Sequence, residues 1–261
     1  MFQEEITNED IVIQNGTSEG TQVKYRKGKY WYKKDNHGNE GLTEYLVSHM
    51  LTYSDLDRSE YVVYEKGTIN GCTGCRSENF LKAGEELITF YRLYQNESGK
   101  DLSQVMASME TMEERIEYVI RFIQETCGLD VTDHLRKVFT LDMLTLNEDR
   151  HLNNLAVVFC DNEFTTAPIF DNGISLLTAN QSVNWDFSME ENVKRVTARP
   201  FSGSHEKMFR YFGIGFRLDL PAVRRWLEGE EYSREKEVLL YQLERYPILG
   251  KGGADGSTRD L

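Results

Sequence analysis

Residues 146–173 read LNEDRHLNNLAVVFCDNEFTTAPIFDNG, and this stretch decides the fold. Asp149 and Asn154 stand five positions apart in a polar loop, and an apolar run over 155–159 follows them. A second apolar run, 167–170, comes directly before Asp171. The chain between Asn154 and Asp171 has room for two short strands and the turn between them. The two acidic positions are therefore predicted to lie at strand ends rather than on an arbitrary surface turn.

The residue types of this stretch suit phosphoryl transfer from a nucleoside triphosphate. In such a site one carboxylate accepts or orients the proton of the attacking hydroxyl, the role predicted for Asp149. An amide oxygen and a second carboxylate hold Mg²⁺ on the phosphates, and Asn154 and Asp171 are predicted to be these ligands. No His/Cys cluster in the sequence would suit zinc better. The alternative is an ordinary surface loop, because Asp and Asn are frequent in loops.

Phosphoryl transfer also needs a cation near the phosphates. The run KYWYKK over 29–34 supplies the candidate, because Trp31 and Lys33 would share one face of a strand. Lys33 is the predicted phosphate lysine, and Lys34, on the opposite face, is the alternative. Glu44, on a predicted helix over 40–51, is the carboxylate expected to pair with it. Arg150 is expected either to contact phosphate or to brace the loop.

A cover over the phosphates is expected from GTSEG, residues 16–20, which precedes the first predicted strand. Backbone N–H groups around Gly16 and Ser18 would contact the nucleotide there. The segment matches neither GxGxxG nor GxxxxGK[ST], and a plain turn is the alternative. Cys72 and Cys75 form a CxxC in NGCTGCRSEN, for which a Gly-rich turn with incidental thiols is favoured over a zinc or redox site.

The first part of the chain is predicted to be rich in strands. Alternating and aromatic runs predict strands over 21–25 and 29–33, joined by 26–28, and further strands over 61–65 and 86–94. The second part is predicted to be helical. Thr111 and Glu114 form a capping box for a helix that Gly128 closes, and another helix is expected over 132–144. Asp219 and Gly229 bound a further helix, and the last runs over 235–246.

This distribution predicts an α+β fold of two lobes around a cleft. Residues 1–92 would form a strand-rich N-lobe that covers the nucleotide. Residues 93–250 would form a helical C-lobe with the catalytic loop and the metal site. Residues 251–261 have almost no apolar content and are predicted to be a disordered tail.

Composition and charge narrow the classes of function. A net charge of −13 over 261 residues argues against general binding to nucleic acids or anionic membranes. No apolar run approaches the ~20 residues of a membrane span. The N-terminus, MFQEEITNED, lacks the hydrophobic region of a signal peptide. The sequence therefore predicts a cytoplasmic protein.

At NEDRHLNN and IFDNG the chain resembles the HipA-like kinases and, within that group, the CtkA-type proteins. More distantly, DRHxxN is similar to the loop of the phosphatidylinositol 3- and 4-kinases. The resemblance extends to the strand of Lys33, the helix of Glu44, SENFL over 77–81 and ARPFSGSHEKMF over 198–209. It implies a bilobal protein-kinase-like fold and ATP-dependent phosphorylation of Ser or Thr on a protein, often with autophosphorylation.

The resemblance also implies residue roles. Asp149 matches the catalytic aspartate, Asn154 and Asp171 match the magnesium ligands, and Lys33 matches the phosphate-binding lysine. The adenine would bind to backbone groups between Thr89 and Tyr91, where the first lobe continues into the second.

Three departures from the family are visible in the sequence. Glu148 stands where relatives often have Gly, and Asp171-Asn172-Gly173 replaces the Asp-Phe-Gly of ordinary protein kinases. HipA toxins carry an extra N-terminal subdomain and work with a DNA-binding antitoxin. The chain is too short for that subdomain, so an antitoxin partner is not supported.

The sequence therefore predicts a Mg-ATP-dependent Ser/Thr kinase that acts on an unidentified protein. Two alternatives remain: the same fold phosphorylating a small molecule or lipid headgroup, and a nucleotide-binding pseudokinase. The absence of a basic amphipathic helix argues against work at a membrane.

Overall fold

The computed structural model describes residues 1–12 and 23–251. The segment 16–20, with Gly16 and Ser18, lies outside the described residues, and so does the predicted tail apart from Lys251. Within the described ranges, no helix combines the length and the apolar content that crossing a bilayer requires.

The first layer is a five-stranded sheet in the order β1-β4-β5-β3-β2. Its strands are β1 (Phe2–Glu4), β2 (Lys24–Lys27), β3 (Tyr30–Lys34), β4 (Tyr64–Ile69) and β5 (Cys72–Glu78). β1 pairs with β4 in parallel, and the other neighbours are antiparallel. The turn between β2 and β3 lies at Gly28, with φ +59°, so Arg26 and Lys27 belong to β2 and not to the predicted turn.

β5 corrects the expectation of a Gly-rich turn around the CxxC. Only Asn70 and Gly71 form the turn, with φ of 51° and 77°. Two successive residues with positive φ match the right-handed twist of the flanking strands, and Asn-Gly favours this geometry. The chain therefore returns at once as a central strand that contains Cys72 and Cys75. All four cysteines are free thiols.

A second sheet joins distant parts of the chain in the order β6-β7-β8. Its strands are β6 (Glu86–Thr89), β7 (Ala156–Cys160) and β8 (Glu163–Thr166), and all pairings are antiparallel. The predicted pair of strands between Asn154 and Asp171 is therefore present. Its second strand ends at Thr166, and the apolar run 167–170 instead forms a single parallel bridge from Ile169 to Tyr61.

The predicted strand 86–94 is wrong in its second half. β6 ends at Thr89, and α2 (Phe90–Ser98) begins at the next residue. The Thr89 hydroxyl oxygen accepts the N–H of Arg92 at 3.1 Å, which satisfies a donor in the first turn of the helix. A threonine cap thus decides where the strand stops.

In the second part, the capping residues predicted from the sequence lie at the ends of helices. Thr111 caps α4 (Met112–Cys127) with the predicted capping box, and Gly128 closes it with φ +70°. Asp219 caps α8 (Leu220–Glu228). The remaining helices are α1 (Glu40–Leu51), α3 (Leu102–Ala107), α5 (Thr132–Thr145), α6 (Met189–Val193), α7 (His205–Phe212) and α9 (Arg234–Arg245).

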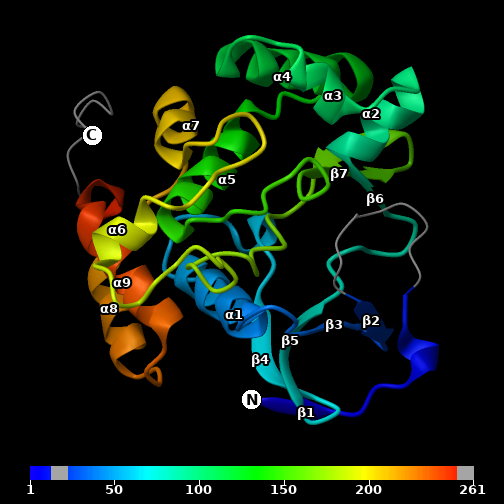
Figure 1. Ribbon diagram of the computed structural model, residues 1–261. Helices are drawn as coiled ribbons and strands as arrows, with labels where there is room; N and C mark the ends of the chain where they lie inside the picture. The colour runs from blue at the N-terminus through cyan, green and yellow to red at the C-terminus, as the bar shows by residue number, and fades with distance from the viewer. Residues whose placement is uncertain (13–22, 252–261) are drawn as a thin grey trace.

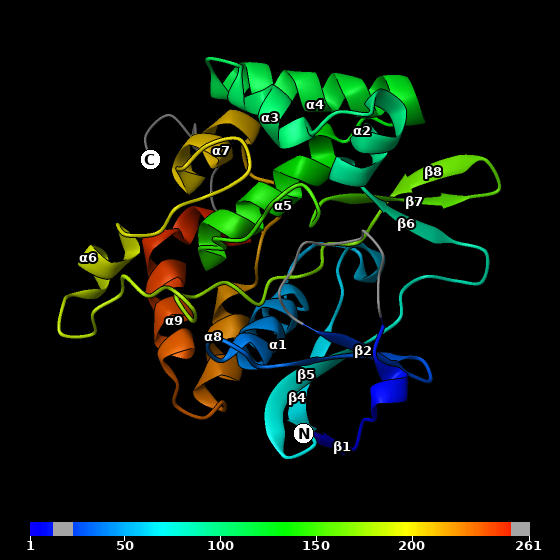
Figure 2. The same cartoon turned by 45° about the vertical axis from the view of Figure 1, so that its right-hand side comes forward.

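One apolar core connects the two parts of the molecule. The inner face of α1, with Leu46, Val47 and Met50, packs into the same core as α5 and α9. On its other side α1 packs against β4 and β5, so it lies between the sheet and the helices (Figure 1). The five-stranded sheet lies low in Figure 2, with β6–β8 above it and α2–α4 at the top. The predicted α+β class, with strands concentrated in the first part of the chain and helices in the second, is confirmed.

A close contact between two glycines sets the distance from α1 to the sheet. A Cβ atom on Gly41 would lie 2.5 Å from the carbonyl carbon of Gly74 in β5. Real Cβ atoms do not tolerate this distance, so the helix would have to move away. The glycine pair therefore fixes the position of Glu44, one turn further along the same helix.

Replacement Gly41→Ala is expected to lower the free energy of unfolding by about 1–3 kcal/mol, because overpacking forces backbone shifts. Urea unfolding of the purified protein measures the change. Gly229→Ala is the matched control, since a Cβ atom there meets nothing nearer than 3.4 Å. Equal stability of the two variants would contradict the close-packing account.

Candidate active site

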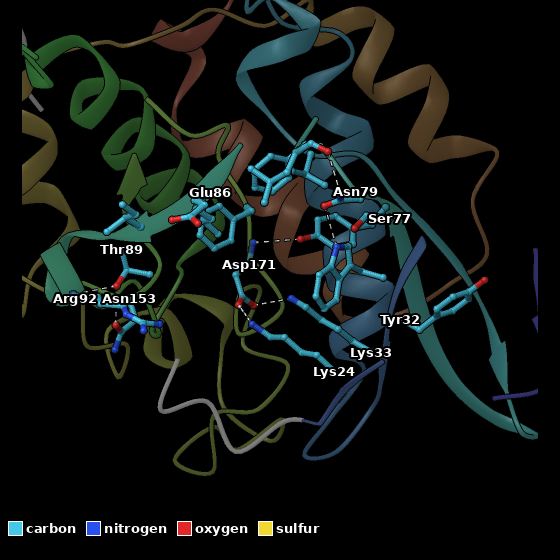
Figure 3. Close-up of a pocket in the computed structure, with 18 of the residues that line it drawn as sticks. Lys24, Tyr32, Lys33, Ser77, Asn79, Glu86, Thr89, Arg92, Asn153 and Asp171 are labelled. Atoms are coloured by element: carbon cyan, nitrogen blue, oxygen red, sulfur yellow. Dashed lines mark hydrogen bonds and ion pairs between the residues drawn. The ribbon is translucent and has the colours of Figure 1, made fainter. Parts of the chain in front are cut away.

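The two sheets border a cavity of about 460 Å³. Its walls come from β2, β3 and β6 and from the segment that ends at Asp171 (Figure 3). Trp31, Val62, Leu87 and Phe170 supply apolar surface, while Lys24, Lys33 and Asp171 supply charge. A mostly apolar hollow of this size with a few converging polar groups suits a ligand of nucleotide dimensions.

Lys33 occupies the centre of the charged end of this cavity. Its Nζ lies 2.8 Å from Oε1 of Glu44 and 2.7 Å from Oδ1 of Asp171. The predicted pairing of Lys33 with Glu44 is thus present. Lys34 points the other way, with its Nζ 5.4 Å from the centre of the Tyr25 ring. Of the two lysines left open by the sequence, Lys33 is the one that faces the cavity.

Charge in this network is stabilised by its neighbours. Burial opposes the charge of Lys33, but the carboxylates of Asp171 and Glu44 outweigh it and raise the pKa of Lys33 well above its usual value. Burial alone would raise the pKa of Asp171. The ammonium groups of Lys33 and Lys24 instead hold the pKa of Asp171 well below the usual aspartate value. Lys33 and Asp171 are therefore ionised at neutral pH.

Glu44 joins three elements through one carboxylate. Oε1 accepts from Lys33 on β3, and Oε2 accepts the N–H of Asn172 at 3.0 Å. Glu44 itself lies on α1 and is 1% exposed. Next to this contact, Asp171 has a left-handed backbone with φ +60°, a conformation that Asp tolerates better than most residues. The carboxylate of Glu44 therefore anchors the turn that presents Asp171.

Arg150 braces the loop 147–154, one of the two roles expected for it. Its guanidinium is fully buried and donates to both carboxylate oxygens of Asp142 on α5, at 2.9 and 3.0 Å. Nη1 donates to the carbonyl of Phe170 at 2.8 Å and more weakly to that of Asn154 at 3.4 Å. One nitrogen thus connects the backbone of Asn154 with the residue before Asp171.

Asp149 and Asn154 lie on this braced loop. The Asn154 amide Nδ2 donates to the carbonyl oxygen of Asp149 at 2.9 Å, which turns its Oδ1 the other way. His151 Nε2 lies 3.7 Å from Oδ2 of Asp149. Burial raises the pKa of Asp149; His151 opposes this shift and the negative charge of Asp171 adds to it. A carboxylate with a raised pKa is better suited to accept a proton than an ordinary surface aspartate.

Asn154 and Asp171, the metal ligands predicted from the sequence, carry oxygen donors of the kind that magnesium prefers. Among the described residues, no three His, Cys, Asp or Glu side chains are grouped to hold a metal ion by themselves. Mg²⁺ in nucleotide sites needs only one or two protein oxygens beside phosphate and water. Asp171 lies in the cavity wall, whereas Asn154 lies on the loop 147–154 and is not among the residues that line the cavity.

In the structure, only one of the two positions named for adenine binding, Thr89 and Tyr91, lies in the wall of the cavity. Thr89 lies at the end of β6 in the wall of the cavity, and its hydroxyl donates to Oδ1 of Asn153 at 3.1 Å. Tyr91 lies on α2, outside the cavity lining, and its N–H donates to the carbonyl of Leu152 at 3.3 Å.

Sequence reasoning missed Lys24. Its Nζ lies 3.3 Å from Oδ2 of Asp171 (Figure 3). The signal is the register of the β2–β3 hairpin, in which Lys24 stands directly opposite Lys33. This register can be derived from the sequence only when the turn of the hairpin is placed at Gly28.

Comparison with solved structures finds matches in fold, of which two are described here. The proinflammatory kinase CtkA of Helicobacter pylori matches with a TM-score of 0.63 at 16% sequence identity, over 96% of each chain. The chain has the fold of the CtkA-type, HipA-like kinases. The Shewanella oneidensis MR-1 toxin–antitoxin complex of HipA, HipB and operator DNA matches with a TM-score of 0.53 at 13% identity.

The second match covers 97% of this chain and 65% of the other. No protein-family model and no curated protein sequence matches the chain. At these identities the likeness to CtkA concerns the fold, and the chemistry of the site has to be argued from the residues described above.

Replacement Arg150→Met is expected to lower the free energy of unfolding by about 3–5 kcal/mol, because it leaves the buried carboxylate of Asp142 unpaired. Denaturant unfolding measures the loss. The double variant Arg150→Met with Asp142→Leu should recover much of it, since no buried charge then remains. A single variant as stable as the unchanged protein would show that the guanidinium does not brace the loop.

Proposed function

We propose that this protein is a Mg-ATP-dependent kinase that transfers the γ-phosphoryl group to a Ser or Thr hydroxyl of a protein, including its own chain. The observation that carries the proposal is the convergence of Lys33, Glu44 and Asp171 at one end of a nucleotide-sized cavity. In phosphoryl transfer most of the catalysis is positioning and electrostatic stabilisation, which such a fixed charge network supplies.

In this proposal each polar group has one task. Asp149 orients the acceptor hydroxyl and takes its proton, for which its raised pKa suits it. Asn154 and Asp171 hold Mg²⁺, which when bound neutralises charge on the phosphates. Lys33 contacts the phosphates, and Glu44 holds its ammonium group in place. The acceptor hydroxyl would then attack the γ-phosphorus and release ADP.

The open edge of β6 supports a position for the adenine. The N–H of Phe90 donates to the carbonyl of Leu155 at 2.8 Å, and antiparallel pairing alternates from that point. The peptide groups of Leu87 and Thr89 therefore face away from β7. We propose that the carbonyl of Leu87 and the N–H of Thr89 pair with the adenine edge. The N–H of Tyr91 already has an acceptor and has no part in this contact.

The lobes follow from the same proposal. Residues 1–92 act as the N-lobe that covers the nucleotide, and residues 93–250 act as the C-lobe that carries Asp149, Asn154 and Asp171. We propose that Gly16 and Ser18, outside the described residues, belong to the cover over the phosphates.

Binding of Mg-ATP is expected to raise the unfolding temperature of the wild-type protein. At ligand about 100-fold above Kd, binding adds roughly 2.7 kcal/mol, which for a chain of this size is on the order of 5–10 °C. Asp171→Asn should lose the magnesium-dependent part of the rise. Asp186→Asn, an exposed aspartate in the same region of the sequence, is the control and should keep it. An unfolding temperature of the wild type that does not rise at saturating Mg-ATP would contradict the proposal.

The raised pKa of Asp149 predicts a pH dependence of phosphoryl transfer. The unprotonated carboxylate is the active form, so kcat/KM should fall as the pH drops through the folded-state pKa of Asp149. Because that pKa is raised, the fall should begin at a higher pH than for an ordinary aspartate.

Asp149→Asn should reduce kcat by roughly 10²- to 10⁴-fold while leaving the binding of Mg-ATP in place. Steady-state kinetics over a pH series test both points, with circular dichroism as the check that the protein stays folded. An unchanged kcat in Asp149→Asn would remove this residue from the mechanism.

A further inference from the structure

Two lysines face the same carboxylate from neighbouring strands. Lys24 on β2 and Lys33 on β3 are direct partners in the antiparallel register. Their Nζ atoms approach different oxygens of Asp171, at 3.3 Å from Oδ2 and at 2.7 Å from Oδ1 (Figure 3). Like charges directly opposite each other in a sheet repel, so Asp171 compensates a cost that the strand pairing imposes.

The two lysines differ in what else they contact. Lys33 also pairs with Glu44, which is almost fully buried and therefore fixed in place next to Lys33. Among the described residues, Asp171 is the only carboxylate within ion-pair distance of Lys24. Lys24 lines the cavity and its side chain is 24% exposed. If Asp171 turns to another cation, Lys33 keeps a partner and Lys24 does not.

We propose that Lys24 is a second phosphate-binding cation, which leaves Asp171 for the nucleotide when magnesium takes that carboxylate. This inference rests on the proposed function. Lys33 is paired with Glu44, and in the ligand-free site Lys24 is paired with Asp171. Once Mg²⁺ neutralises Asp171, the ammonium group of Lys24 becomes the additional positive charge in the cavity. A polyphosphate is the anion that fits beside it.

The shared carboxylate also couples the two ligands. Magnesium alone has to displace both ammonium groups from Asp171 with no anion to receive Lys24. A nucleotide alone draws the lysines away and leaves the Asp171 carboxylate facing the phosphates. Binding of either ligand therefore lowers the free-energy cost of binding the other, so the two ligands bind with positive coupling.

Replacement Lys24→Met is expected to have two effects of opposite sign. The affinity for Mg-ATP should fall by roughly 10- to 100-fold, the usual range for losing one charge-assisted contact. The affinity for Mg²⁺ alone should rise, because one competitor for Asp171 is gone. Lys24→Arg should keep both affinities near those of the wild type. Lys27→Met is the matched control, since this lysine of the same strand pairs with Glu4 away from the cavity.

Isothermal titration of the full chain with Mg²⁺ alone, with ATP in a chelator and with Mg-ATP measures these affinities without any turnover. Weaker Mg-ATP binding together with tighter Mg²⁺ binding in Lys24→Met, and in that variant only, supports the proposal. Unchanged Mg-ATP affinity in Lys24→Met, with normal binding by the wild type, overturns it and leaves the proposed function intact. Failure of the wild type to bind Mg-ATP at all would instead reject the proposed function.

Discussion

The buried ammonium group of Lys33 is the constraint on which the site depends. It lies between Glu44 and Asp171, and these two carboxylates come from a helix and a loop far apart in the sequence. A buried charge without a partner costs several kcal/mol, so the three groups have to meet if the molecule folds as described. The sheet, α1 and the turn at Asp171 are therefore positioned against each other by the same contact that holds Lys33 and Asp171 in the cavity wall.

Arg150 is a second buried cation, and it connects separate elements on the other side of the site. Arg150 ties the loop of Asp149 and Asn154 to α5 and to the residue before Asp171. Most of the folding energy comes from the apolar core that α1 shares with α5 and α9, whereas the buried ion pairs decide which geometry the polar loops adopt. The arrangement explains how an irregular loop can hold its side chains firmly enough for the proposed phosphoryl transfer.

Much of this was readable from the sequence, and the failures have physical causes. Asp149, Asn154 and Asp171 are proposed as site residues because their residue types at this spacing serve one chemistry. The helices α4 and α8 are predictable because their caps are local signals. The sequence does not reveal β5, because its Gly-rich start resembles one long turn, whereas Asn70 and Gly71 alone form a two-residue hairpin turn. The sequence does not point to Lys24, because its contact with Asp171 depends on a cross-strand register, which is not a property of any single segment.

The central claim is that this cavity transfers phosphate from ATP to a protein hydroxyl. The most direct measurement is incorporation of γ-labelled phosphate into the purified chain and into added protein acceptors, with the modified residues located by mass spectrometry. The account predicts magnesium-dependent label on Ser or Thr with the wild type, and its loss in Lys33→Met but not in Lys34→Met. Equal labelling by Lys33→Met, or no labelling of any protein by the folded wild type with Mg-ATP, would contradict it.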